Sequence, residues 1–467
     1  MTAPGLLGVL GDDLGALLER LRGGPSPGLH PFQGPDGSRW LHLRVHTDGT
    51  GTLLVDASAA VHLDATAVHL AWLALRQVPS RRARAALAAC HPGAPVGAWA
   101  ADFSRMRDLV DALARHGTCA GCAALDAGAV LVDPRPARAP TKADLVLTYA
   151  CQNACSHCYN EPNRRRTSPL ELSTGVAILD RLADVGVCHV VFTGGEPTLH
   201  PDVVLLVRHA VRRGLVVGLN TNGRRLSALA VTLADAGLDH VQVTLASARP
   251  EVHDAVVGAK AHAETVAGLA AAVAASGKDG HGPSVLTNTT LTRRTAPCIE
   301  ETVDLAADLG VRTVAVNGMI ASGSGRDHPD TLPLEALEPT VIRARDRAEA
   351  RGLAFLWYTP TPWCRLSPVV HDLGPKCCNA AEHSICVEPD GAVLPCQSWY
   401  APAGNLLTDP WTAIWDSPAF RRIRERRIRP AEAGLPERCH TCPDLPACGG
   451  GCGLEAWAVP RSARCPM

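Results

Sequence analysis

The sequence lacks an excess of charge of either sign, and it lacks any long uninterrupted apolar run. Its 467 residues carry 45 Lys and Arg against 46 Asp and Glu, for a formal net charge of −1. This balance gives no global basic field, so the composition argues against a nucleic-acid partner or an anionic membrane. No stretch reaches about 18 consecutive apolar residues, so the sequence predicts no transmembrane span.

The first residues lack the features of an export signal. No basic region precedes the first apolar residues, and Asp12, Asp13 and Glu19 interrupt them. We therefore expect a cytoplasmic protein in a reducing compartment, where disulfides are rare. Clustered cysteines in such a compartment are more often metal ligands or catalytic thiols.

What the sequence does have is 18 cysteines, which are unevenly distributed. Residues 1–140 hold three of them and end in a Pro-, Arg- and Ala-rich stretch typical of a linker. Residues 141–330 alternate short apolar runs with longer amphipathic stretches, and ten cysteines fall in residues 360–467. We therefore predict three domains, at residues 1–140, 141–330 and 331–467.

The middle part predicts an α/β fold. Apolar runs predict six strands, at 145–148, 189–193, 216–220, 240–245, 285–291 and 313–317. Helical patterns lie between them, at 174–185, 202–212, 226–236, 264–275 and 299–309. Such alternation favours a parallel sheet with right-handed crossovers. About 180 residues are too few for a closed eight-unit barrel, which leaves a partial barrel or a doubly wound sheet, with function at the carboxyl ends of the strands.

Three cysteines directly follow the first predicted strand. Cys151, Cys155 and Cys158 lie within eight residues of one another. Three thiolates leave one tetrahedral position open, as a centre that acts on a substrate requires. Thiolates are also the usual ligands of iron–sulfur clusters. A zinc knuckle completed by His157 is the alternative.

Polar and glycine residues also follow the next two strands. The second strand ends in Gly194, Gly195 and Glu196, and the third leads into Asn220 and Asn222. The two glycines let a ligand approach the backbone closely, and Glu196 offers an acceptor for an ammonium group.

The order C-x-x-x-C-x-x-C and then GGEP resembles the radical S-adenosylmethionine (SAM) superfamily. The resemblance implies a partial (β/α)6 TIM-like barrel and a [4Fe–4S] cluster on Cys151, Cys155 and Cys158. One iron would chelate SAM, which is cleaved reductively to a 5′-deoxyadenosyl radical that abstracts hydrogen. His157 stands where the family has an aromatic ring.

The same resemblance implies further SAM contacts. Gly194, Gly195 and Glu196 would place the amino end, and Thr244 falls where the family often has a hydroxyl near the ribose. Val257 stands where many members have an Arg, which puts a carboxylate contact there in doubt. The other candidates, whose alternative is ordinary strand-end polarity, are Asn220, Asn222, Asn288 and residues 319–325.

The C-terminal cysteine pattern resembles the SPASM extension of peptide- and protein-modifying radical SAM enzymes, which carries two auxiliary [4Fe–4S] clusters. By position, one cluster would use Cys378, Cys396, Cys452 and an upstream cysteine, for which we favour Cys364 over Cys377. The other would use Cys439, Cys442, Cys448 and Cys465. Two zinc ribbons are the structural alternative. Gln397 stands where sulfatase-maturing relatives place an Asp, and an amide is no base near neutral pH.

Residues 51–113 predict two short strands and three helices. They resemble the winged-helix recognition element of ribosomally synthesised and post-translationally modified peptides (RiPPs), which clamps a precursor leader by strand addition. A dimerisation or packing domain is the alternative. Cys119 and Cys122 form a C-x-x-C pair that is weak evidence for a redox or metal site.

These features together predict a radical SAM/SPASM enzyme that modifies a ribosomal precursor peptide by cross-linking, thioether formation or epimerisation. Its cofactors would be SAM and three [4Fe–4S] clusters, and its partners a precursor peptide and a low-potential donor of flavodoxin or ferredoxin type. The alternatives are a maturase of a folded protein, a small-molecule radical SAM enzyme and a non-enzymatic iron–sulfur electron carrier.

Overall fold

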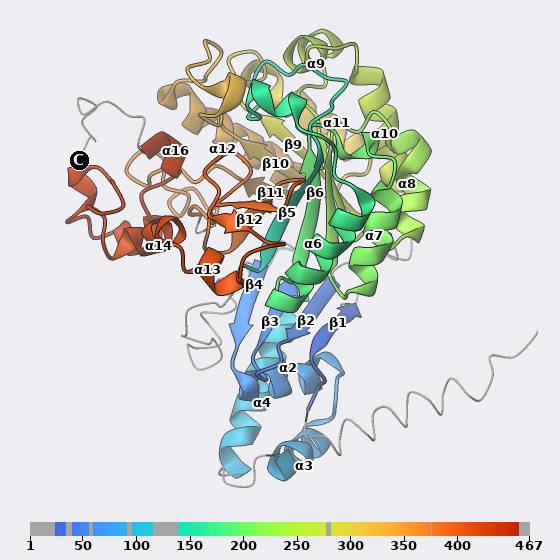
Figure 1. Ribbon diagram of the computed structural model, residues 1–467, viewed down its shortest axis with the longest axis vertical. Helices are drawn as coiled ribbons and strands as arrows, with labels where there is room; N and C mark the ends of the chain where they lie inside the picture. The colour runs from blue at the N-terminus through green and yellow to red at the C-terminus, as the bar shows by residue number, and fades with distance from the viewer. Residues whose placement is uncertain are drawn as a thin grey trace, which may run out of the picture. The chain divides into compact units, whose positions relative to one another are not determined.

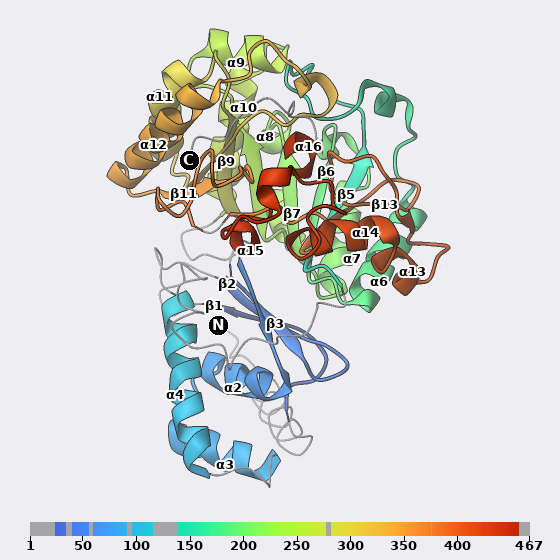
Figure 2. The same cartoon turned by 90° about the vertical axis from the view of Figure 1, so that its left-hand side faces the viewer.

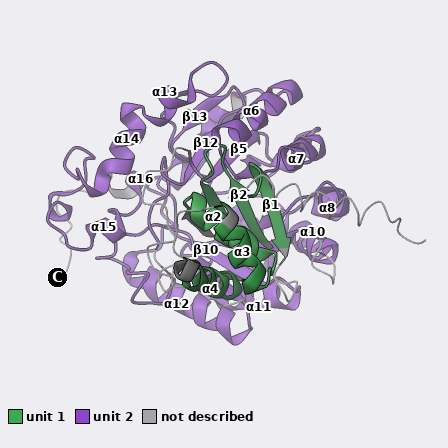
Figure 3. Cartoon of the chain, turned by 90° about the horizontal axis from the view of Figure 1, so that it is seen from below, with its two compact units in different colours: residues 1–136 green, residues 137–467 purple. Residues whose placement is uncertain are grey.

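The computed structural model describes residues 24–33, 40–55, 59–90, 96–114, 139–276, 282–374 and 376–456. The chain divides into two compact units, residues 1–136 and residues 137–467 (Figure 3). No helix in these ranges is long and apolar enough to cross a bilayer. The predicted C-x-x-C pair Cys119/Cys122 and the predicted ligand Cys465 lie outside the described residues.

Unit 1 is an antiparallel sheet with three helices. The sheet has the order β1 (Gly28–Gln33), β2 (Trp40–Val45), β3 (Gly51–Val55) and β4 (Ala59–Leu63). The helices are α2 (Ala65–Leu75), α3 (Ser80–Cys90) and α4 (Val96–Leu113). The two strands and three helices predicted for residues 51–113 are confirmed as β3, β4 and α2 to α4, whereas β1 and β2, which precede this stretch, were not predicted. The alternation in β2, with Leu41, Leu43 and Val45 buried, was the signal that was missed.

Two of the helices of unit 1 show clear reasons for their position. Asp64 caps α2, because its Oδ1 accepts a 2.7 Å hydrogen bond from the backbone N–H of Ala67. On α4 the periodic apolar residues that predicted the helix are all buried in one core: Phe103, Met106, Leu109, Val110 and Leu113.

Unit 2 contains the predicted parallel sheet. Its strands are β5 (Lys142–Thr148), β6 (His189–Gly194), β7 (Val216–Thr221), β8 (His240–Thr244), β9 (Ser284–Thr290) and β10 (Thr313–Asn317). They pair in sequence order and are all parallel. A doubly wound sheet would reverse its strand order at a switch point, so this winding is that of a partial barrel.

Helices cover the outside of this sheet. Figures 1 and 3 show them as an arc around the strands. They are α6 (Leu172–Val185), α7 (Val203–Arg212), α8 (Leu226–Asp235), α10 (His262–Ala275), α11 (Ile299–Asp308) and α12 (Leu334–Ala350), with the shorter α9 (Pro250–Val257) after β8. The apolar strand residues facing them, such as Leu145, Phe192 and Val243, are fully buried. Because side chains alternate along a strand, Asp144, Asn220 and Asn288 face the interior of the curved sheet.

The cysteine-rich region adds strands to both edges of the sheet. On one side β11 (Ala354–Trp357) pairs with β10, and on the other β12 (Ser384–Val387) pairs with β5, both in parallel. Two more antiparallel strands, β13 (Ala392–Leu394) and β14 (Gly404–Asn405), follow. The remaining helices are α13 (Trp411–Trp415), α14 (Pro418–Arg424), α15 (Leu445–Cys448) and α16 (Gly453–Ala456), and they face the viewer in Figure 2. The predicted boundary at residue 330 remains a prediction.

Candidate cofactor site

The three-cysteine segment begins where β5 ends and is held by the end of α9. The backbone N–H groups of Ala154 and Ser156 donate to the carbonyls of Val257 and Val256, each at 2.9 Å. Gly258 has a φ of +66°, and a Cβ there would lie 2.4 Å from the carbonyl oxygen of Ala154. Val257 is 1% exposed, so this position supports the cysteine segment through its backbone.

The two glycines after β6 allow close backbone contact with the end of β5. A Cβ on Gly194, which has a φ of +137°, would lie 2.1 Å from the Thr148 carbonyl oxygen, and one on Gly195 would lie 2.5 Å from the Ala150 carbonyl. Gly195 N–H donates to the Thr148 carbonyl at 2.7 Å. The glycines therefore bring the GGEP segment against the residues just before Cys151.

Glu196 is fully buried and joins three segments. Its Oε1 accepts hydrogen bonds from the backbone N–H and hydroxyl of Thr198 and from the hydroxyl of Thr221, and its Oε2 accepts from the N–H of Asn222 at 2.8 Å. Burial raises its pKa, while these donors oppose the shift. Oε1 thus accepts three hydrogen bonds and Oε2 one, and the predicted contact of Glu196 with an ammonium group remains a prediction.

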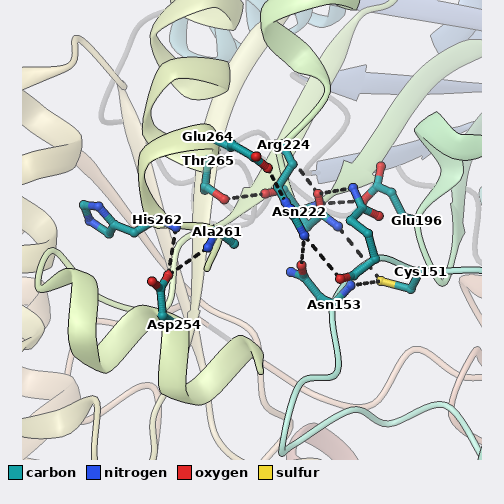
Figure 4. Close-up of polar contacts among 12 residues, drawn as sticks. Cys151, Asn153, Glu196, Asn222, Arg224, Asp254, Ala261, His262, Glu264 and Thr265 are labelled. Carbon is teal, nitrogen blue, oxygen red and sulfur yellow. Dashed lines mark hydrogen bonds and ion pairs between the residues drawn. The ribbon is translucent and has the colours of Figure 1, made fainter. Parts of the chain in front are cut away.

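Asn222 lies between Glu196 and Cys151 (Figure 4). Its Nδ2 lies 3.9 Å from the Cys151 Sγ, which also accepts from the N–H of Asn153 at 3.4 Å. Arg224, which the sequence analysis did not single out, donates from Nη1 to the Gln152 carbonyl and Asn153 Oδ1 and pairs through Nε with Glu264. It thereby fixes the segment that follows Cys151.

Three predicted SAM contacts lie on the inner face of the sheet. Asn220 is level with Gln242 on β8, and Thr244 is level with Asn288 on β9. The Oδ1 of Asn288 is buried without a hydrogen-bond partner, as is the Oε1 of Gln152. Because a buried acceptor that lacks a donor is costly, both oxygens fit a site whose ligand supplies the donor.

Residues 319–325 contact the cysteine segment directly. The N–H of Ser324 donates to the Cys158 carbonyl at 2.8 Å, and a Cβ on Gly323 would lie 2.5 Å from the same oxygen. Burial lowers the pKa of His157 to about 4, with His328 adding to the shift. The neutral imidazole is a flat uncharged ring, as an aromatic residue at this position would be.

The described cysteines can be compared with the arrangement that a single metal ion requires. The described parts of the chain contain no group of three or more His, Cys, Asp or Glu side chains that could hold one. Zinc draws four ligands to within about 2.3 Å of one point, whereas each thiolate of a four-iron cluster binds a different iron. Cys151 is exposed and Cys155 and Cys158 are half-buried, and their assignment as the ligands of one cluster remains a prediction.

One of the C-terminal cysteines, Cys378, lines a small cavity. Its other walls include Trp399, Arg422 and Arg426, and the glycines on both sides of Cys452. Burial raises the pKa of Cys396 to about 12, and nearby Cys378 adds to it. Cys378 and Cys396 both pack against the main core of unit 2, and their assignment to one auxiliary cluster with Cys452 remains a prediction.

The two candidates for the fourth ligand of this predicted auxiliary cluster, Cys364 and Cys377, have different surroundings. Cys364 is exposed and follows Trp363, whose backbone N–H lies 3.4 Å from the Cys448 Sγ. A Cβ on Gly451 would lie 2.6 Å from Pro362, so this turn packs against the segment that carries Cys452. Cys377, in contrast, accepts a 3.2 Å hydrogen bond from Arg427.

The predicted second auxiliary cluster is described only in part. Cys439 and Cys442 pack on a small apolar core of Ala433, Leu435 and Leu445, and Cys448 is buried. Cys386, which the sequence left without a role, is also completely buried, and burial raises its pKa well above the usual value.

Three comparisons with known proteins bear on this site. The family model "Radical SAM superfamily" matches residues 145–306, and the model "Iron-sulfur cluster-binding domain" (SPASM) matches residues 377–443. PqqA peptide cyclase of Streptomyces rochei is 32% identical over 335 residues, which are 70% of this chain and 87% of that protein. Mycofactocin maturase MftC of Mycobacterium ulcerans is 33% identical over 320 residues, 66% of this chain and 81% of that protein.

The fold is similar to that of solved structures. SuiB of Streptococcus suis bound to its precursor peptide SuiA gives a TM-score of 0.63 at 16% identity, over 91% of this chain and 96% of that one. This coverage includes much of unit 1 as well as unit 2. Native anSMEcpe with bound AdoMet gives a TM-score of 0.51 at 15% identity, over 67% of this chain and 89% of that one.

Proposed function

Because this chain belongs to the radical SAM superfamily and carries its SPASM iron–sulfur domain, we propose that it modifies a ribosomally synthesised precursor peptide. The chain is an enzyme whose cofactors are SAM and [4Fe–4S] clusters. When bound, the SAM-binding cluster would supply the electron for reductive cleavage of SAM, and this would provide the radical chemistry that abstracts hydrogen from a substrate carbon. Cross-linking, thioether formation or epimerisation would follow.

The chain's own residues would bind and orient these groups. Cys151, Cys155 and Cys158 would hold the SAM-binding cluster, and Asn222 and Arg224 fix the segment that carries them. Asn288 and Gln152, with their unpaired buried oxygens, would accept hydrogen bonds from SAM. The auxiliary clusters would use Cys364, Cys378, Cys396 and Cys452, and Cys439, Cys442, Cys448 and Cys465.

A peptide substrate is supported mainly by the two relatives, PqqA peptide cyclase and mycofactocin maturase. This chain aligns with more than four fifths of the length of each. Gln397 supports it, because its amide cannot act as the base of the sulfatase-maturing type, and its Oε1 accepts from the Tyr159 hydroxyl at 3.1 Å.

Unit 1 would bind the leader of that peptide by strand addition. Its two edge strands are β1 and β4. Pro31 lies in the middle of β1. The nitrogen of a proline in an edge strand faces away from the sheet, so β1 lacks a backbone donor there for an added strand. The outer edge of β4 contains no proline, so β4 is the edge that would pair with an extended leader.

The protein would act in the cytoplasm and receive electrons from a low-potential carrier of flavodoxin or ferredoxin type. A reducing compartment suits both the free cysteines and such a carrier.

The first test is anaerobic turnover with SAM and dithionite. We expect 5′-deoxyadenosine from the reconstituted enzyme and only background from a variant with Cys151, Cys155 and Cys158 all changed to Ala. We also expect about twelve iron atoms per chain, the number in three four-iron clusters. Background-level product from the wild type, or stoichiometric zinc in place of iron, would refute the proposal.

The second test is modification of a precursor peptide, to be sought as a short open reading frame beside the gene. Mass spectrometry should show a changed core when the leader is attached and little change when the leader is removed. The substitution Val61→Pro, in the middle of β4, should weaken leader binding at least about tenfold while leaving SAM cleavage intact. Equal binding by this variant would refute the role of β4.

A further inference from the structure

A group of arginines on α3 has no role in the site described above. Arg81, Arg82 and Arg84 lie near the start of this helix, and all three are exposed. The helix itself contains no acidic residue. These three residues, called the α3 arginine face below, concentrate positive charge in a protein whose formal net charge is −1.

The α3 arginine face points away from the core of unit 1. Ala83 and Leu87, one turn apart on α3, are fully buried in that core. Because an α-helix has about 3.6 residues per turn, Arg81 and Arg84 lie on the opposite side of α3. Ala85 lies beside them and is also exposed, so no bulky side chain of α3 stands between the guanidinium groups.

A fourth arginine reaches the same end of α3 from α4. Nη1 of Arg107 donates to Oγ of Ser80, the first residue of α3, at 3.3 Å. Four arginines therefore surround the N-terminal turn of α3.

No carboxylate in the described part of the chain neutralises these four arginines. On the neighbouring helix α4, Asp102 is paired with Arg105. Asp108 and Asp111 also lie on α4, but neither forms an ion pair with the four arginines. The positive charge at this end of α3 is thus not compensated within the described residues.

This arrangement is unfavourable in the protein alone. A cation at a helix N-terminus is repelled by the partial positive charge of the first N–H groups, and like charges three residues apart, such as Arg81 and Arg84, repel each other. The first turn of α3 has no acidic side chain to offset either effect. An anionic partner would be attracted both by the guanidinium groups and by the helix terminus, so the face fits a partner that carries several carboxylates.

Resting on the proposed function, we infer that the α3 arginine face binds an acidic stretch of the leader of the precursor peptide. The β4 edge proposed to pair with that leader belongs to the same unit, and α2 packs on both β4 and α3. Backbone pairing at a sheet edge supplies affinity and leaves specificity to side chains, which here would be supplied by the arginines. Arg81 and Arg84 are about 4.5 Å apart along the helix axis, which suits a few carboxylates better than the long run of phosphates in a nucleic acid.

The test measures binding of two fluorescently labelled probes, an oligoglutamate peptide and the leader, to the reconstituted full-length enzyme. We expect the Kd of Arg81→Gln/Arg84→Gln for both probes to rise at least about tenfold, with a weaker salt dependence because fewer ion pairs form. The matched control is Arg208→Gln/Arg212→Gln, two exposed arginines on α7. It removes the same charge and should change the Kd less than about twofold, because exposed charges away from the bound peptide are screened.

Thermal unfolding separates binding from a structural role. Because Arg and Gln have similar helix propensity and the arginines are unfavourably placed, the melting temperature of Arg81→Gln/Arg84→Gln should equal or exceed that of the wild type. Arginines that merely held α3 in place would instead be missed by the fold, and the melting temperature would fall together with the affinity.

A change in the peptide provides the reciprocal measurement. A leader whose Asp and Glu residues are replaced by Asn and Gln should bind the wild type about tenfold more weakly, and it should bind Arg81→Gln/Arg84→Gln with little further loss, because both changes remove the same ion pairs. Such coupling is expected only if the acidic residues contact the arginine face.

Four results would overturn the inference. They are a leader without a cluster of Asp or Glu, a neutralised leader that binds the wild type as tightly as the natural one, equal losses of affinity in the α3 and α7 variants, and a labelled RNA hairpin that loses affinity in the α3 variant while the leader does not. Absence of dithionite-driven 5′-deoxyadenosine in the wild type would be a failure of the proposed function, and it is measured separately from the Kd values.

Discussion

The hydroxyl of Tyr149 donates a 2.7 Å hydrogen bond to Oε1 of Glu388, a carboxylate that is 2% exposed. Arg164 contacts the other carboxylate oxygen at 3.2 Å. Tyr149 lies two residues before Cys151, and Glu388 lies in the SPASM region just after β12. Two parts of the chain that are 239 residues apart are thus joined beside the cofactor site.

Tyr400 extends the connection. Its ring lies under the Arg164 guanidinium, 4.3 Å from the ring centroid, and its hydroxyl donates to Asn160, whose Nδ2 donates to the Gly194 carbonyl. The cysteine segment, the GGEP segment and the SPASM region are therefore linked by one set of polar contacts.

The first prediction concerns this link. Tyr149→Phe should lower the free energy of unfolding by about 1–3 kcal/mol, because it leaves a buried carboxylate oxygen without its donor. The matched control is Tyr358→Phe, which removes a hydroxyl that makes no hydrogen bond recorded in the described part of the chain, and which should change stability much less. Urea unfolding under anaerobic conditions measures both. Equal losses in the two variants would contradict the role of the Tyr149–Glu388 bond.

The second prediction concerns Gly194. Gly194→Ala should cost about 2 kcal/mol or more of stability and displace the GGEP segment, because the new Cβ meets the fixed backbone carbonyl of Thr148. Gly352→Ala is the control: Gly352 also has a positive φ, +70°, but has open space around it, so only the strain of about 1 kcal/mol remains. Thermal unfolding and SAM affinity measure the effects. SAM affinity that is unchanged in Gly194→Ala would contradict the assigned packing.

The third prediction concerns pH. The Nε2 atoms of His189 and His240 lie 2.7 Å apart, and burial lowers the pKa of His240 to about 4. Below pH 6.5 the unfolded chain takes up a proton at this residue that the folded protein does not. Stability is therefore fully present above pH 6.5 and is lost as pH falls toward 4, by at most about 1.4 kcal/mol per pH unit for one group.

His240→Gln should remove the contribution of His240 to the change of the unfolding free energy with pH between pH 5.5 and 7.5, as measured by urea unfolding. The slope should not vanish, because burial also lowers the pKa of His253 to about 4. Stability curves of variant and wild type that run parallel across this range would show that His240 does not titrate as described.

The fourth prediction concerns the fourth ligand of the auxiliary cluster beside the cavity. Cys364→Ser should lower iron by about one cluster per chain, because the turn that carries Cys364 packs on the Cys452 segment. Cys377→Ser should retain its iron, because Arg427 already occupies that sulfur as a hydrogen-bond donor. Iron analysis and electron paramagnetic resonance of the reduced proteins distinguish the two. Loss of the cluster in Cys377→Ser alone would reverse the assignment.

Strong local patterns explain which elements the sequence predicted. All six central strands are confirmed, because each is an apolar run followed by a helical pattern of sufficient length. β11 and β12 were missed because each has only four residues, and their pairing with β10 and β5 comes from residues far away in the chain. A four-residue strand carries too little periodicity to be recognised without its neighbour.

The sequence by itself determined the order of the chemistry: three cysteines after one strand, GGEP after the next, and a cysteine-rich end. Spacing is a local property, and thiolate chemistry depends on residue type. Only the tertiary structure decided that Glu196 is enclosed by Thr198, Thr221 and Asn222, that Gly194 faces the backbone of β5, and that Arg224 and Glu388 support the cysteine segment. Those contacts join residues that no local pattern connects, because burial and hydrogen-bond partners are set by which chain segments the fold brings together.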